Sequence, residues 1–209
     1  MTVDKTSLNP ETKRLTEAQA MRALTHPVRI ALIEVLAVHQ RLTATQAGEL
    51  IQETPTTCSF HLRQLAKYGF VEEAGPGKGR QRPWKLVNMG FTIQEEDLNA
   101  EGRVAADVLV QMFFRRAFGR FERWQHIHWS YPEEWDRASA ADQAAMFVTT
   151  TELEEVNAKV REVLEGYRDR LIDPSLRPGD SRLVEVLYLA YPVDLDTAVV
   201  AKNLDSEEA

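Results

Sequence analysis

The stretch TPTTCSFHLRQLAKYGFVEE, residues 54–73, holds the features that decide the fold. Pro55 suits the first position of a helix, because the backbone N–H that proline lacks has no partner there. Gly69 suits the end of that helix, because glycine adopts a positive φ without steric cost. The residues FVEE that follow are suited to an extended strand. The stretch therefore predicts a helix over 55–68 that passes directly into a strand.

The predicted helix has one apolar and one polar face. On a wheel of 100° per residue, Cys58, Leu62 and Leu65 fall within about 60° of one another, which predicts that they face the core. The opposite face carries Thr56, Phe60, Arg63 and Lys67, with Thr57 and Gln64 at its edges. An outward helix face of this composition can contact a partner.

Further elements are predicted on both sides of this helix. Pro10 and Pro27 each suit a helix start, and Thr45–Ile51 reads as a short helix. After the helix over 55–68, two strand-like runs enclose a basic, glycine-rich loop, which predicts a hairpin. The expected elements are helices at 10–24 (capped by Asn9), from 27 and at 45–51, and strands at 70–74 and 83–88 around a loop at 75–82.

This order of elements is that of a winged helix-turn-helix, in which the last helix enters the major groove of DNA. Hydroxyl groups near a helix N-terminus can bind phosphates, and long polar side chains can reach base edges. The hairpin can lie along a phosphate backbone or enter a minor groove. The predicted DNA-binding residues are Thr56, Thr57, Ser59, Phe60, Arg63, Gln64 and Lys67 on the helix, and Lys78, Arg80 and Arg82 on the wing. Phe60 could contact a thymine methyl or cover the hairpin.

Two sequence stretches resemble a known family. LTHPVRIALIEVL at 24–36 is similar to the opening of the ArsR-type winged-helix transcriptional regulators, and TTCSFHLRQLAKYGFVEE resembles their recognition helix. The wing GKGRQRPWKL resembles a subgroup with a longer C-terminal extension. The resemblance covers about residues 15–87. It implies binding to double-stranded DNA, control of transcription and a homodimer that matches a palindromic site.

The resemblance does not extend to the metal sensing that some members of the family perform. The helix before the recognition helix, TATQAGELI, has no cysteine or histidine. His126 and His128 would point about 160° apart on a helix and cannot hold one ion together. Cys58 is interpreted as a core residue, and His61 as a packing or phosphate-adjacent residue. We expect no metal and no cofactor.

The C-terminal half is predicted to be helical. A long apolar helix is expected from about 97 to 129, and Thr149 with Glu152 forms a capping-box pattern before a helix with an apolar stripe. RLVEVLYLAYPV, residues 182–193, is rich in strand-forming residues. The fold class is therefore mainly α with a small β wing (α+β), ending in a strand. We expect a disordered tail at 1–9, a DNA-binding domain at 10–95, a dimerisation and effector domain at 96–200, and a frayed tail at 201–209.

Aromatic residues are concentrated in the predicted long helix and just after it. They could line a pocket for a small apolar effector, or they could form a dimer interface or an internal core. The residues concerned are Phe113, Phe118, Phe121, Trp124, Trp129 and Trp135.

Charge and composition limit the classes of function that remain. The net charge of −7 is unevenly spread: residues 55–86 carry six bases and two acids, near +4, whereas 132–173 carry five bases and eleven acids, near −6. A protein-interaction module that uses the winged helix or the acidic half is the alternative to a DNA-binding regulator.

Nucleotide-binding and hydrolase motifs are absent from the sequence, so we expect no enzyme and no catalytic residues. A single cysteine and the lack of long apolar runs favour a cytoplasmic protein without membrane contact.

Overall fold

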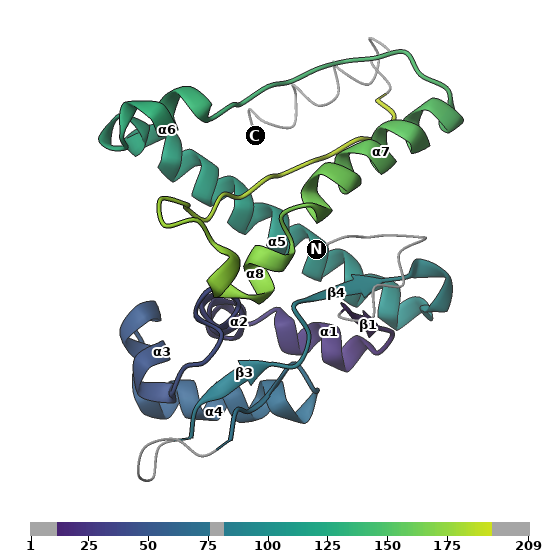
Figure 1. The fold of residues 1–209 in the computed structure, drawn as a ribbon. Helices are drawn as coiled ribbons and strands as arrows, with labels where there is room; N and C mark the ends of the chain where they lie inside the picture. Colours follow the sequence, from purple (N-terminus) through teal and green to yellow (C-terminus); the bar gives the residue numbers. More distant parts are fainter. Residues whose placement is uncertain (1–11, 76–81, 194–209) are drawn as a thin grey trace, which may run out of the picture. The chain divides into compact units, whose positions relative to one another are not determined.

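The computed structural model describes residues 12–75 and 82–193 (Figure 1). The predicted N-terminal tail, the Asn9 cap, the wing residues Lys78 and Arg80, and the tail from 201 lie outside this range. The structure is mainly helical with four short strands. Its elements are β1 (Thr12–Leu15), α1 (Ala18–Leu24), α2 (Pro27–His39), α3 (Ala44–Ile51), α4 (Pro55–Lys67), β2 (Val71–Glu73), β3 (Trp84–Leu86), β4 (Gly90–Ile93), α5 (Ala100–Ile127), α6 (Glu133–Ala138), α7 (Thr150–Glu165) and α8 (Asp169–Ile172), with 3-10 turns at Glu95–Asp97, His128–Ser130 and Pro174–Leu176.

Helices α2, α3 and α4 form a helix-turn-helix unit around one core. Each begins with a side-chain cap: His26 accepts from the Val28 amide, Thr43 from Gln46 and Thr54 from Thr57. The Thr43 cap is a full capping box, because the Gln46 side chain also accepts from the Thr43 amide. The core residues include Ile30, Leu32, Leu36, Cys58, Leu62 and Leu65, none more than 1% exposed.

The predicted hairpin is confirmed. Strands β2 and β3 pair antiparallel, with Val71 opposite Leu86 and Glu73 opposite Trp84. The backbone of Trp84 also exchanges hydrogen bonds with that of Leu42, just before α3, so the hairpin is tied to the helix-turn-helix. Strand β3 contacts α2, and strand β2 contacts α4.

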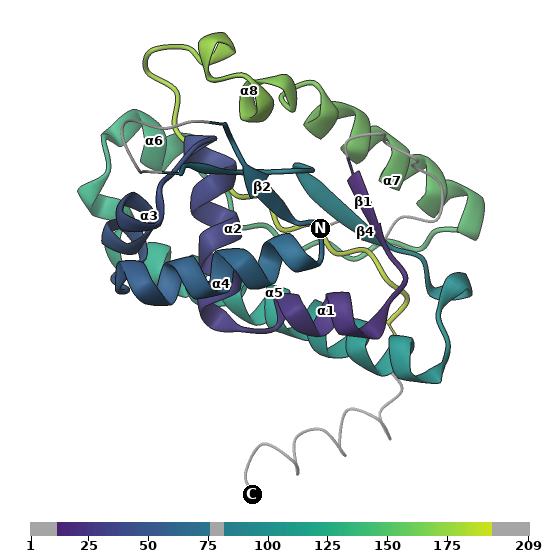
Figure 2. The ribbon, with the colours of Figure 1, turned by 90° about the horizontal axis from the view of Figure 1, so that it is seen from below.

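The helix predicted over residues 10–24 is wrong in its first part. Residues 12–15 form strand β1, which pairs in parallel with β4 from Thr12 opposite Gly90 to Leu15 opposite Ile93. The helix α1 starts only at Ala18. The reason is a partner far along the chain, since β4 follows the wing and supplies backbone hydrogen bonds that a local pattern does not reveal. Figure 2 shows β1 and β4 side by side.

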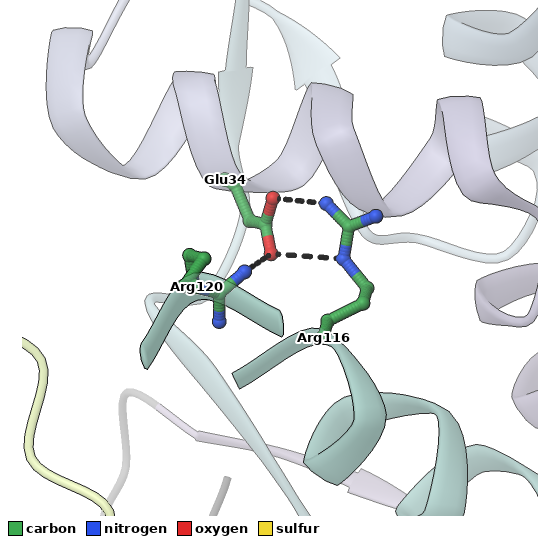
Figure 3. A network of polar contacts seen from close by, with 3 residues as sticks. All are labelled: Glu34, Arg116 and Arg120. Carbon is green, nitrogen blue, oxygen red and sulfur yellow. Dashed lines mark hydrogen bonds and ion pairs between the residues drawn. The ribbon is translucent and has the colours of Figure 1, made fainter. Parts of the chain in front are cut away.

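Helix α5 spans 28 residues, about 42 Å at 1.5 Å per residue, and passes Gly119 without a break. Its N-terminal half packs against α1, as both ribbon views show (Figures 1 and 2). Its middle reaches α2 through a polar cluster. Glu34 of α2 accepts hydrogen bonds from Arg116 and Arg120, which lie one turn apart on α5 (Figure 3).

The chain divides into two compact units. Unit 1 comprises residues 1–140 and 168–177, and unit 2 comprises 141–167 and 178–209. This division places α5 in the same unit as the helix-turn-helix. The short segment 168–177 belongs to unit 1 because it binds the end of α2. Gln40 Nε2 donates to the Leu171 carbonyl at 2.8 Å, and Arg177 Nη1 donates to that of Val38 at 3.3 Å.

In unit 2, α7 begins at the predicted capping box, in which Thr149 and Glu152 bond reciprocally. The strand predicted over 182–193 is wrong: these residues form no strand. A strand requires a hydrogen-bonded neighbour, and the described residues of unit 2 contain no other strand. High strand propensity alone is therefore not sufficient to form a strand here.

Candidate nucleic-acid interface

Helix α4 exposes the face that the wheel predicts. Cys58, Leu62 and Leu65 are fully buried, so the helix is fixed against α2 and α3. Thr56, Phe60, Arg63 and Lys67 are exposed, while Thr57, Ser59 and Gln64 are half-buried beside them. Phe60 is 55% exposed, which is unusual for a large aromatic side chain. No acidic residue occurs from Pro55 to Lys67, so this face is positively charged.

The N-terminus of α4 presents hydroxyl groups. Thr54 accepts a hydrogen bond from the Thr57 amide at 3.1 Å, and the hydroxyls of the two threonines lie 2.9 Å apart. Pro55 at the first helical position leaves one fewer free amide there. Thr56 next to this cap is exposed. Hydroxyls and free amides at a helix N-terminus are suited to bind a phosphate.

Two histidine rings are in contact on the buried side of α4. The rings of His26 and His61 lie 4.3 Å apart, and His61 is only 7% exposed. His61 Nδ1 has no hydrogen-bond partner among the described residues. Burial lowers the pKa of both imidazoles, and for His61 the nearby His26 and Arg29 lower the pKa further. The sequence predicted that His61 is a packing or phosphate-adjacent residue; its contact with His26 could be anticipated only from the helix-turn-helix arrangement.

Arg29 holds the end of α1. Its guanidinium donates to the carbonyl oxygens of Ala23 and Arg22, so its charge lies over the α1 C-terminus. Burial lowers the pKa of Arg29. Arg29 thus fixes the junction between α1 and α2, close to the histidine pair.

The wing cations that the structure describes are paired within the hairpin. Arg82 Nη1 lies 2.9 Å from Glu73 Oε2, and Lys85 Nζ lies 3.0 Å from Glu72 Oε1. Glu72 and Lys85 are directly opposite in the strand register, which the sequence pattern could have revealed. Both pairs are exposed, so each contributes little to stability. The sequence prediction omitted Lys85, although it lies in the same wing.

The six aromatic residues do not lie together. Phe113 packs against Phe91 of β4, with ring centroids 5.3 Å apart. Further along α5, Phe121 and Trp124 stack at 5.8 Å, and a chain of ring contacts continues through His128 to Trp129. Phe118 and Trp129 are exposed, and Trp135 is half-buried on α6. Two surface cavities of about 40 and 280 Å³ lie beside β1, and none of the six residues lines either.

Other kinds of site find little support in the part of the chain that the structure describes. It contains no cluster of three or more metal-ligating side chains. Cys58 is buried, and burial raises the pKa of its thiol, so it is not a reactive thiolate. His128 Nδ1 contacts Asp136 at 2.7 Å rather than His126. None of the described helices combines the length and the apolar character that crossing a membrane requires.

Three solved structures are similar to the chain. One is a homodimeric winged helix-turn-helix DNA-binding domain from Mycobacterium bovis, a possible ArsR-family transcriptional regulator, at 20% identity over 44% of this chain and 74% of that chain, with a TM-score of 0.31. The YusO protein from Bacillus subtilis is similar at 10% identity over 70% and 82%, with a TM-score of 0.31. A mutant of MepR from S. aureus bound to an oligodeoxyribonucleotide is similar at 14% identity over 71% and 86%, with a TM-score of 0.29.

The sequence itself matches one family. Residues 24–74 match the family described as "Helix-turn-helix domain", and no curated protein matches the chain. The matched range runs from the end of α1 to the end of β2, so it contains all of α2, α3 and α4. Together with the antiparallel hairpin that follows, the match shows that this chain carries a winged helix-turn-helix domain, the fold of many DNA-binding transcriptional regulators.

Proposed function

We propose that this protein is a homodimeric transcriptional regulator of the ArsR type that binds double-stranded DNA in a sequence-specific manner. Helix α4 enters the major groove with Thr56, Phe60 and Arg63 toward the bases. Thr57, Ser59, Gln64 and Lys67 contact bases or phosphates at the edges of the same face. The wing, with Lys78, Arg80 and Arg82, lies on the neighbouring backbone or minor groove.

One observation carries the proposal: the exposed face of α4 is free of acidic residues in a protein of net charge −7. A local basic face attracts anions such as the DNA backbone even when the net charge of the protein is negative. The face also combines an arginine with an exposed aromatic ring, and these read guanine edges and thymine methyls respectively. The buried side of α4 holds this face rigid, as positioning in a groove requires.

The homodimer follows from the geometry of such sites. A single α4 reads few base pairs, whereas two copies related by a two-fold axis read half-sites about 34 Å apart. The exposed aromatic residues Phe118 and Trp129, with Phe113, Phe121, Trp124 and Trp135, contribute to this dimer or to a pocket for a small apolar effector.

Selection of bound sequences from a random duplex library tests the proposal. We expect an enriched palindrome with half-sites about 10 base pairs apart. For the selected duplex, Arg63→Ala should raise the Kd by roughly 5- to 150-fold, which corresponds to the loss of about 1–3 kcal/mol for a bidentate contact to guanine. Arg103→Ala removes an exposed arginine on α5 and serves as the charge-matched control.

The salt dependence of binding separates the alternative function. A DNA-binding protein loses affinity steeply as salt rises, because each neutralised phosphate releases a counterion. If no motif is enriched and Arg63→Ala changes no DNA affinity, the protein does not act through α4 on DNA. A protein-interaction module would then be the better account.

A further inference from the structure

The C-terminal apolar segment, residues 182–193, is rich in large apolar side chains, but none of them is buried. From Val186 to Val193, no backbone–backbone hydrogen bond joins the segment to another described residue. Its large apolar side chains are all at least 40% exposed. They are Leu183, Val184, Val186, Leu187, Tyr188, Leu189, Tyr191 and Val193. Apolar residues occupy both alternating faces, as in strands that are covered on both sides.

The described residues of unit 2 form no completed core. None of its described residues is buried, although α7 presents an apolar stripe of Leu153, Val156 and Val160. Val163 and Tyr167 continue this stripe and are 65% and 60% exposed. A compact unit that buries no side chain lacks the main source of folding free energy. Unit 2 is therefore incomplete within one copy of the described chain.

The exposed area matches what a dimer requires. Eight large apolar side chains that each expose on the order of 100 Å² provide roughly 800 Å², the share of one partner in an interface of standard size. The run from Val186 to Val193 contains no charged residue, and charges are the usual protection against pairing at a free strand edge. The segment is thus suited to pair with an equally uncharged strand.

We propose that the C-terminal apolar segments of two copies of this chain pair as antiparallel strands across a two-fold axis. The α7 stripes of the two copies cover the two-stranded sheet that results. A second copy is the occupant because an isologous interface gives each segment a partner of identical length, exposure and lack of charge. The inference deepens the homodimer of the proposed function, and it requires no DNA.

The first test measures the mass of the full-length protein in solution by light scattering or sedimentation, without DNA. We expect a dimer, and the double variant Val186→Lys, Tyr188→Lys should raise the dimer Kd about 100-fold or more. Leu50→Lys alters an exposed residue of α3 in unit 1 and is the matched control, which should stay dimeric. A wild-type monomer at all concentrations, or an unaffected dimer in the double variant, would overturn the inference.

The second test locates the two-fold axis. Single cysteines are placed in turn at positions 184 to 190, and disulfide formation between copies is measured under oxidising conditions. Because opposed residues lie closest at the axis, antiparallel pairing predicts one maximum with lower yields on both sides. Equal yields at every position would indicate parallel in-register pairing and would contradict the proposal. If Arg63→Ala leaves DNA affinity unchanged while the dimer persists, the proposed function fails and this inference stands.

Discussion

The carboxylate of Glu34 on α2 binds the guanidinium of Arg116 on α5 through two hydrogen bonds, of 2.6 and 3.3 Å (Figure 3). Arg120 adds a third bond of 2.9 Å to the same carboxylate. The three side chains are between 30% and 39% exposed. The cluster joins α2, the first helix of the helix-turn-helix unit, to the long helix α5.

Loss of this carboxylate should weaken the junction between α2 and α5. We expect Glu34→Ala to lower the free energy of unfolding by about 1 kcal/mol, because a bidentate pair is lost and two arginines one turn apart then repel each other. Urea denaturation measures the effect. Glu49→Ala, at an exposed glutamate of α3, should change stability by no more than about 0.5 kcal/mol. Equal effects of the two substitutions would show that the cluster contributes nothing specific.

Gly48 in α3 lies where no side chain fits. A Cβ atom there would stand 2.5 Å from the backbone oxygen of Glu53, at the turn into α4. Gly48→Ala should therefore lower stability by about 2 kcal/mol through forced displacement of that turn. Gly119→Ala is the control: no atom lies within 4 Å of the added methyl group, and the helix should gain about 0.5–1 kcal/mol. Thermal unfolding of the two variants should shift in opposite directions.

Phe60 offers a test that separates binding from stability. Because its ring is 55% exposed, Phe60→Ala should change the free energy of unfolding by less than about 1 kcal/mol. Affinity for the selected duplex should fall about tenfold, with the largest loss at a position occupied by thymine. Replacement of that thymine by uracil removes the methyl group and should reproduce the loss with the wild-type protein. An unchanged affinity for both would assign Phe60 no role at the bases.

The histidine pair should make folding sensitive to acid. Both pKa values are lowered in the folded state, so the unfolded chain binds protons first as the pH falls. Stability is complete above the unfolded pKa of about 6.5 and is lost as the pH falls through the lower folded pKa. His61 faces His26 and Arg29, which disfavour its charge, and Glu53, which favours it.

His61→Leu removes one of these groups together with an unpartnered buried nitrogen. We expect this variant to keep its stability at pH 7.5 and to lose less than the wild type at pH 5.5, as measured by urea denaturation. Cys58→Ala is the control, since the buried thiol is neutral at both values. It should cost about 1–2 kcal/mol equally at each pH. A His61→Leu variant with the full wild-type loss would contradict this account.

The helix-turn-helix and the face of α4 could be predicted from the sequence because their signals are local. Pro55, Cys58, Leu62 and Gly69 lie within four helical turns, and their spacing alone determines the buried side. Strand β1 could not be predicted, since Thr12 pairs with Gly90 far along the chain. The ion pair of Glu72 and Lys85 in the wing could also have been predicted, because the strand register follows from the hairpin. The DNA contacts themselves remain predictions.

The attachment of residues 168–177 to α2 has a consequence for cleavage of the chain. Residues 141–149 form no regular structure and are fully on the surface, so a protease reaches them first. A cut there would separate the two pieces covalently. The bonds from Gln40 to Leu171 and from Arg177 to Val38 would still hold the C-terminal piece to α2. We expect the nicked protein to migrate as one species in gel filtration and as two in a denaturing gel, with the double variant Gln40→Ala, Arg177→Ala releasing the second piece.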